Sequence, residues 1–190
     1  ALNAPLFVAP ETNRIEDALE LSGKPLVEPL RLNEWVKPAF QDINASTVAA
    51  TLSVLQKEGL QTPPRQLEGA HASWQWQGRF QVLSGSPTVV LDGAHNPEAM
   101  RVLKESTRQY AKERPVHIVF SALGTKDLKA MLSLLSPIAA SLILTPSTVR
   151  RSLSATELAG LGTEFPVCHS PGEALAKACE RASKDGGIVL

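Results

Sequence analysis

The chain reads, near its midpoint, Val89-Val90-Leu91-Asp92-Gly93-Ala94-His95-Asn96-Pro97, a short apolar run followed at once by an acid, a glycine, a histidine and an Asn-Pro step. Asn96 is typical of a helix N-cap, and Pro97 is typical of the first helical position. Asp92 and His95 are therefore expected at a corner where a strand ends and a helix begins. Because ligands bind outside the carboxyl ends of the strands in open α/β sheets, this corner is a candidate site.

From residue 88 onward, apolar runs alternate with helical patterns. The expected strands lie at 88–91, 116–120, 141–145, 165–168 and 187–190, and the expected helices near 97–112, 126–140, 154–161 and 171–184. This alternation is the signature of βαβ units and a largely parallel sheet. The last helix is expected to begin with a capping box between Ser170 and Glu173. Its buried stripe is expected to comprise Leu175, Ala178, Cys179 and Ala182.

The first part of the chain is less regular. Residues 11–22 and 44–58 show helical patterns, and the segment between them shows few convincing strands. Two helices and some loops make a poor domain on their own. We therefore expect residues 1–84 to be the tail of a larger domain with a linker, and residues 85–190 to form an α/β domain.

Composition excludes several classes of protein. Nineteen basic residues balance nineteen acidic residues, so no broad basic field indicates nucleic acid or a membrane surface as a partner. The apolar stretches fall well short of the roughly 20 residues that span a bilayer, and no leader pattern opens the sequence. Cys168 and Cys179 are too few for a disulfide framework or a zinc site, and no metal-ligating set is expected. The expectation is a soluble, cytoplasmic protein.

The common nucleotide-binding and hydrolase motifs are absent from these residues. There is no G-x-x-x-x-G-K-[ST] loop, no G-x-G-x-x-G fingerprint and no G-x-S-x-G elbow. The pair Gly160 and Gly162 follows a helical pattern, not a strand, and fits the end of a helix. A self-contained nucleotide enzyme is therefore not expected.

A second short motif, Gly78-Arg79-Phe80-Gln81, lies upstream of the corner. If the two segments flanking residues 84–87 are extended, Arg79 and Asp92 lie at remote ends of the pair, and their meeting depends on how the linker folds. An arginine can bind a phosphate with two hydrogen bonds, and a carboxylate can accept both hydroxyls of a ribose. The alternative is that Arg79 pairs with a local acid and Asp92 caps a backbone turn. His95 can likewise be only a hydrogen-bonding corner residue.

The two motifs together, Gly78-Arg79-Phe80-Gln81 and Leu91-Asp92-Gly93-Ala94-His95-Asn96-Pro97, resemble the signature of the folylpolyglutamate synthase and dihydrofolate synthase family, within the Mur ligase superfamily. Further matches are Asn44-Ala45 before an alanine-rich helix, Lys126-Asp127 after an expected strand, and Arg151 ahead of an expected helix start. The resemblance implies a Rossmann-like, mostly parallel sheet flanked by helices, which is the Mur ligase C-terminal domain. It also implies that a helical remnant of the central ATPase domain precedes this sheet.

The resemblance further implies ATP-dependent amide formation in folate biosynthesis and one-carbon metabolism. ATP with Mg²⁺ phosphorylates a carboxylate of dihydropteroate or folate, and the amine of L-glutamate attacks the acyl phosphate. By the match, Asn44 resembles the contact to the base of ATP, Arg79 the contact to phosphate and Asp92 the contact to ribose. His95 resembles a catalytic residue near the phosphates and the incoming glutamate, with charge stabilisation as its expected role. From spacing alone, Asn44 is equally a helix N-cap or first-turn residue.

The sequence also departs from the family pattern. The family's P-loop, its magnesium ligands and its carbamylated lysine are absent from these residues, and Thr125 stands where an aspartate commonly precedes Lys-Asp. This stretch alone is therefore expected to be inactive and to need the missing N-terminal ATPase region, where the ligands of Mg²⁺ are mainly expected. Two alternatives stay open: a non-catalytic module that binds a nucleotide or folate, and another amide ligase of the Mur type.

Overall fold

The computed structural model describes residues 44, 47, 48, 51, 54, 55, 59, 77–124, 127–161 and 164–190. The chain divides into two compact units, Ala1–Gln75 and Trp76–Leu190. In the first unit, the described positions from Asn44 to Leu55 are helical, in agreement with the expected helix there, and Gly59 follows with a φ of 97°. The helix expected at 11–22 lies outside the described residues.

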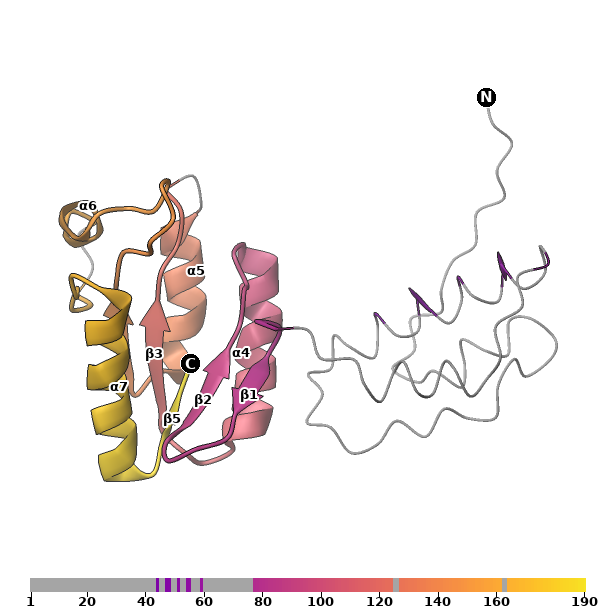
Figure 1. The fold of residues 1–190 in the computed structure, drawn as a ribbon, viewed down its shortest axis with the longest axis horizontal. Coiled ribbons are helices and arrows are strands. Elements are labelled where there is room, and N and C mark those ends of the chain that lie inside the picture. Colours follow the sequence, from indigo (N-terminus) through magenta and orange to yellow (C-terminus); the bar gives the residue numbers. More distant parts are fainter. Residues whose placement is uncertain are drawn as a thin grey trace. The chain divides into compact units, whose positions relative to one another are not determined.

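The second unit contains a mixed sheet with the strand order β1-β2-β5-β3-β4 (Figure 1). Its strands are β1 (Gln81–Leu83), β2 (Thr88–Leu91), β3 (Val116–Phe120), β4 (Ser141–Leu144) and β5 (Ile188–Val189). β1 runs antiparallel to β2, whereas the other three pairings are parallel. The expected α/β fold with a largely parallel sheet is confirmed.

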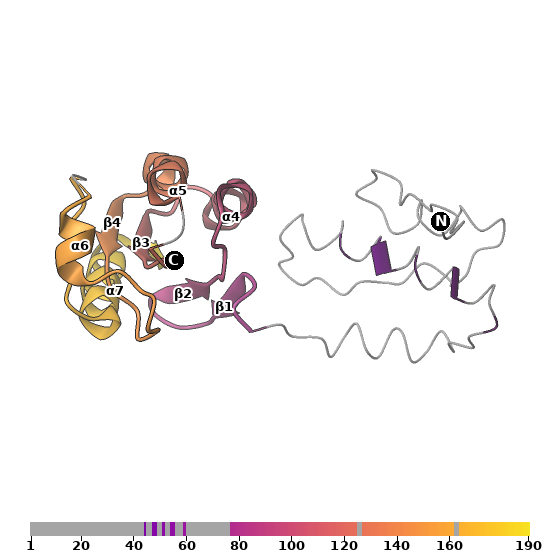
Figure 2. The ribbon, with the colours of Figure 1, turned by 90° about the horizontal axis from the view of Figure 1, so that it is seen from above.

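Helices cover both faces of the sheet. They are α4 (Pro97–Ala111), α5 (Leu128–Leu135), the 3₁₀ turn η1 (Ser136–Ile138), α6 (Ala155–Ala159) and α7 (Pro171–Asp185). Figure 2 shows α4 and α5 on one face and α7 on the other. The core lies between these layers and includes Ile118, Leu132, Leu144 and Ile188, which are all buried. None of the helices in the described part of the chain combines the length and the apolar character that crossing a bilayer would require.

The start of α4 follows the prediction from the sequence. The side chain of Asn96 accepts a hydrogen bond from the backbone N–H of Ala99 at 2.8 Å, and Pro97 occupies the first turn. This bond satisfies one of the N–H groups that a helix start leaves without a partner.

Four predictions for the other elements were wrong in detail. The buried stripe of α7 is Ala174, Ala178 and Ala182, whereas Leu175 is 42% exposed, because small side chains allow the helix to lie close to the sheet. Ser170 caps α7, but the carboxylate of Glu173 accepts from the N–H of His169, so no complete capping box forms there.

The run at 165–168 forms a single bridge, between Val167 and Leu144, not a strand. The helix expected over 126–140 ends at Leu135 and continues as η1, where Pro137 cannot donate the next helical hydrogen bond. The division between the units also differs from the expected one at 84, because β1 pairs with β2 and therefore belongs to the sheet.

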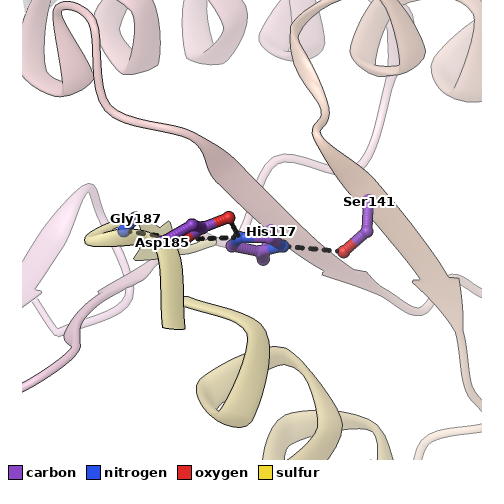
Figure 3. Close-up of polar contacts among 4 residues, drawn as sticks. All are labelled: His117, Ser141, Asp185 and Gly187. Carbon is purple, nitrogen blue, oxygen red and sulfur yellow. Dashed lines mark hydrogen bonds and ion pairs between the residues drawn. The ribbon is translucent and has the colours of Figure 1, made fainter. Parts of the chain in front are cut away.

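A buried histidine on β3 links β4 to the end of α7 (Figure 3). The ring of His117 on β3 lies between Ser141 on β4 and Asp185 at the end of α7, with Nδ1 2.9 Å from the Ser141 hydroxyl and Nε2 2.9 Å from Asp185 Oδ2. Asp185 Oδ1 also accepts from the N–H of Gly187, which directly precedes β5. A Cβ at Gly187 would lie 2.7 Å from the carbonyl oxygen of Pro115, so only glycine fits there. These contacts lie at the amino ends of the parallel strands, opposite the candidate corner.

Candidate functional site

The hairpin of β1 and β2 brings the two motifs together. Its register pairs Gln81 with Leu91, so the residues before β1 and after β2 lie side by side at the open end of the hairpin. The backbone N–H of Phe80 donates to Asp92 Oδ2 at 2.8 Å. From the sequence, proximity of Arg79 and Asp92 depended on how the linker between them folds. The antiparallel pairing of β1 with β2 places the segments that carry these two residues next to each other.

Asp92 holds the backbone of this corner with both carboxylate oxygens. Oδ2 accepts from Phe80, and Oδ1 accepts from the N–H of Ala94 at 2.7 Å. Asp92 therefore does cap a backbone turn, which is one of the two roles that the sequence allows. Each carboxylate oxygen can accept more than one hydrogen bond, so acceptor capacity for a ligand hydroxyl remains.

The turn over residues 78–81 is held in an uncommon backbone conformation. Gly78 has a φ of 70° and Phe80 a φ of 46°. The N–H of Gly78 donates to Gln81 Oε1 at 3.0 Å, and its carbonyl accepts from the N–H of Gly93 at 2.7 Å. The Phe80 ring is 4% exposed and packs edge to face on Tyr110. A Cβ at Gly93 would lie 3.3 Å from the Gly78 carbonyl oxygen, so a small residue suits this approach.

Arg79 stands at the apex of this turn. Its side chain is exposed and forms no hydrogen bond or ion pair with any residue that the structure describes. The ion pair with a local acid, the alternative that the sequence left open, is therefore not formed within the described ranges. The nearest acid along the hairpin, Asp92, is engaged with backbone N–H groups instead. The guanidinium is thus available to an anion.

His95 lies on the other side of the corner, before α4. Its Nδ1 is 3.0 Å from the carbonyl oxygen of Gly93, and a carbonyl can only accept, so Nδ1 carries a hydrogen. The ring is exposed and its Nε2 has no partner among the described residues. When His95 is neutral, Nε2 is an acceptor, and when His95 is cationic, Nε2 is a donor.

The remaining residues of interest lie elsewhere. Asn44 belongs to the first unit, where it is helical and exposed, and Lys126 lies outside the described residues. Arg151 is exposed in the loop after β4, where its carbonyl accepts from the N–H of Gly124. In the part of the chain described here, no three His, Cys, Asp or Glu side chains gather in a group that could hold a metal ion. Within the second unit, the structure therefore brings together Arg79, Asp92 and His95.

Sequence reasoning missed the part that Gln81 plays. The sequence analysis gave Gln81 no role of its own within its motif. In the structure, its side chain accepts a hydrogen bond from the N–H of Gly78 and closes the turn that carries Arg79. The available signal in the sequence was the position of Gln81 three residues after Gly78. This spacing allows a hydrogen bond from the backbone of Gly78 to the side chain of Gln81 only if the segment forms a turn, and the sequence alone does not establish the turn.

Comparisons with known proteins relate the second unit to a known family. Residues 78–190 match the family described as "Mur ligase, glutamate ligase domain". The chain is 34% identical, over 122 residues, to a probable bifunctional folylpolyglutamate synthase/dihydropteroate synthase of Haloferax volcanii, with 62% of this chain and 14% of that protein covered. It is 31% identical, over 121 residues, to the dihydrofolate synthase/folylpolyglutamate synthase of Escherichia coli, with 64% and 28% covered.

A solved structure supports the same relationship. The folylpolyglutamate synthase of Mycobacterium tuberculosis, complexed with ADP, is similar with a TM-score of 0.67 and 26% sequence identity, over 80% of this chain and 37% of that one. The present chain therefore spans between about a seventh and about two fifths of the length of these relatives.

Proposed function

Because the chain belongs to the family of the Mur ligase, glutamate ligase domain, we propose that it is part of an ATP-dependent ligase that joins L-glutamate to dihydropteroate or folate. ATP transfers its terminal phosphoryl group to a carboxylate of the pterin or folate substrate and leaves as ADP. The amine of glutamate then attacks the acyl carbon, displaces inorganic phosphate and loses a proton, which gives the amide. The observation that carries the proposal is the exposed Arg79, which has no partner among the described residues and whose backbone lies in an anchored turn beside the corner of Asp92 and His95.

The corner supplies charge and position to the reaction. Arg79 binds phosphate oxygens of ATP through its planar donor fork, which suits phosphate geometry. His95, fixed by its bond to Gly93, directs Nε2 outward, and in the cationic form this nitrogen donates to a phosphate oxygen or to the developing charge of the acyl phosphate. Phosphoryl transfer is accelerated mainly by such positioning and charge stabilisation.

Two further residues contact the nucleoside in this proposal. Asp92 accepts hydrogen bonds from the ribose hydroxyls with the acceptor capacity that its backbone bonds leave. Asn44 offers an amide donor and acceptor to the adenine base. The first unit, Ala1–Gln75, is then the end of the central ATP-binding domain.

The rest of the site lies in the full-length ligase. We assign no Mg²⁺ ligand to the described residues, because they gather no suitable group of side chains. The P-loop and the ligands of Mg²⁺ belong to the N-terminal ATPase region, so the present residues alone are inactive. The full-length ligase works in the cytoplasm, where its substrates ATP and folate are available.

The test is glutamate incorporation by the full-length ligase, with dihydropteroate or tetrahydrofolate as the acceptor. Arg79→Ala should weaken ADP binding by about 10- to 100-fold, since it removes charged hydrogen bonds that contribute about 1.5–3 kcal/mol. Arg108→Ala, at an exposed arginine in the last turn of α4, is the matched control and should bind ADP normally.

Each outcome is informative. Glutamate transfer to only one of the two acceptors identifies the substrate. Absence of transfer to both acceptors would overturn the proposed ligase activity. ADP binding without any transfer would favour the non-catalytic nucleotide-binding module.

A further inference from the structure

We propose that Gln81 is a positioning residue for Arg79: its side chain closes the turn that presents the guanidinium to the anionic ligand. The inference rests on the proposed function, in which Arg79 binds phosphate. It adds a residue to which the sequence motif assigned no role, and it makes phosphate affinity depend on a side chain that acts through the backbone of the turn.

Hydrogen bonds fix the backbone on both sides of Arg79. Before it, the N–H of Gly78 donates to Gln81 Oε1 at 3.0 Å, and the Gly78 carbonyl accepts from Gly93 at 2.7 Å. After it, the N–H of Phe80 donates to Asp92 at 2.8 Å. Arg79 itself is exposed and has no partner among the described residues, so its backbone is held while its charged group is left open.

The backbone angles point to a function for this turn. A φ of 46° is uncommon for a residue with a side chain, and Phe80 is bulky. The conformation persists because burial of the Phe80 ring, its contact with Tyr110 and the bond to Asp92 outweigh the local strain. Strain that the surroundings enforce in this way clusters at ligand-binding sites. Here it holds the backbone at Arg79, an exposed arginine without a partner among the described residues, beside the segment that carries Asp92 and His95.

Gln81 is the part of this arrangement that can be changed without removing the sheet. Its backbone is paired with Leu91 in β1, and only its side chain reaches back to Gly78. Loss of the side-chain acceptor therefore removes one of the two hydrogen bonds that hold Gly78. The bond from Gly93 to Gly78, the pairing of β1 with β2 and the bond between Phe80 and Asp92 remain.

The experiment uses the full-length ligase and measures the dissociation constant of ADP. Gln81→Met keeps the length of the side chain but removes the acceptor, and should weaken ADP binding about fivefold, the effect of one hydrogen bond of about 1 kcal/mol. Gln109→Met is the matched control, because Gln109 is an exposed glutamine on α4 that bonds only to Glu105.

A double-mutant cycle separates positioning from general destabilisation. In an Arg79→Ala background, Gln81→Met should have no further effect on ADP binding, because the residue acts through Arg79. A fivefold loss that persists in that background would overturn the inference, and so would unchanged binding by Gln81→Met beside a large loss by Arg79→Ala. Unchanged binding by Arg79→Ala itself would instead overturn the proposed role of Arg79.

A second variant tests the inference if Gln81→Met is destabilised. If Gln81→Met lowers the melting temperature, Gln81→Asn replaces it, because the shortened amide is still polar but is one methylene too short to reach Gly78. The same fivefold loss is expected from Gln81→Asn, and wild-type affinity in that variant would contradict the positioning role.

Discussion

The buried hydroxyl of Thr107 lowers the stability of this fold. This residue is fully buried on α4, and its hydroxyl has no hydrogen-bond partner within the described part of the chain. A buried hydroxyl without a partner costs about 1–3 kcal/mol relative to its hydrated state in the unfolded chain. The local sequence does not reveal this, because threonine is acceptable at many helix positions.

Thr107→Val should therefore raise the free energy of unfolding by about 1 kcal/mol. Valine has nearly the same shape and the same branching at Cβ, so packing and helix propensity change little. Urea denaturation of the two chains measures the difference. Thr107→Ala removes the methyl group as well and should give a smaller gain or a loss, and a less stable Thr107→Val would contradict the interpretation.

The candidate site illustrates what single residues reveal before a structure is known. Asn96 and Pro97 could be predicted, because a helix cap depends on its immediate neighbours. The role of Gln81 could not, because it depends on a turn with positive φ angles that the packing of Phe80 and its hydrogen bond to Asp92 sustain. Leu175 was misassigned since its spacing fits an apolar stripe equally well, and the close approach of α7 to the sheet selects alanines instead.

At the scale of elements, the sequence predicted the presence of most helices and strands but not which contacts join them. The alternation of apolar runs is a local signal, whereas the insertion of β5 between β2 and β3 depends on contacts across the whole unit. Part of that information lies in His117, which joins β3, β4 and the end of α7 at the amino ends of the strands (Figure 3).

Asp185→Ala should lower the free energy of unfolding by about 1–3 kcal/mol, because it leaves the nearly buried Nε2 of His117 without its partner. Removal of an acid from a helix C-terminus by itself would stabilise by only about 0.3–1 kcal/mol, so a net loss shows that the bonds of Asp185 to His117 and Gly187 dominate. Asp185→Asn keeps an acceptor oxygen and should lose less. A net gain in stability for Asp185→Ala in urea denaturation would contradict this account.

The short helix α6 should respond to acid. Glu157 accepts hydrogen bonds from the backbone N–H and then the side chain of Ser154, and these bonds lower the pKa of its carboxyl below the ordinary 4.5. A lowered pKa in the folded state means that the stabilisation is complete above the ordinary carboxyl range and is lost as the pH falls through the folded-state pKa. The amide signals of α6 should therefore shift below pH 4.5 in an NMR titration.

Glu157→Gln is the matched control for this titration. Glutamine still offers an acceptor to Ser154 but cannot be protonated in this range, so its α6 signals should be independent of pH. Identical titration curves for the two chains would exclude the capping box of Ser154 and Glu157 as the cause.

At the scale of the whole molecule, the predicted and observed boundaries of the α/β unit differ. The sequence places the start of the α/β domain at residue 85, whereas the compact unit runs from Trp76 to Leu190. The difference is the first strand of the hairpin with the turn before it, which carries Arg79 and buries Phe80. The sequence could not place this boundary, because β1 is only three residues long and its membership of the sheet depends on its pairing with β2.

Two truncated chains decide between these boundaries. Residues 76–190 should unfold in one cooperative transition, because they contain the whole sheet and its core. Residues 85–190 lack β1, leave the edge of β2 unpaired and lose the Phe80 ring, whose removal alone costs about 3–5 kcal/mol. They should therefore unfold at a lower urea concentration or fail to fold. Equal midpoints for the two chains in urea, followed by circular dichroism, would show that β1 contributes little and that the boundary at residue 85 is the physical one.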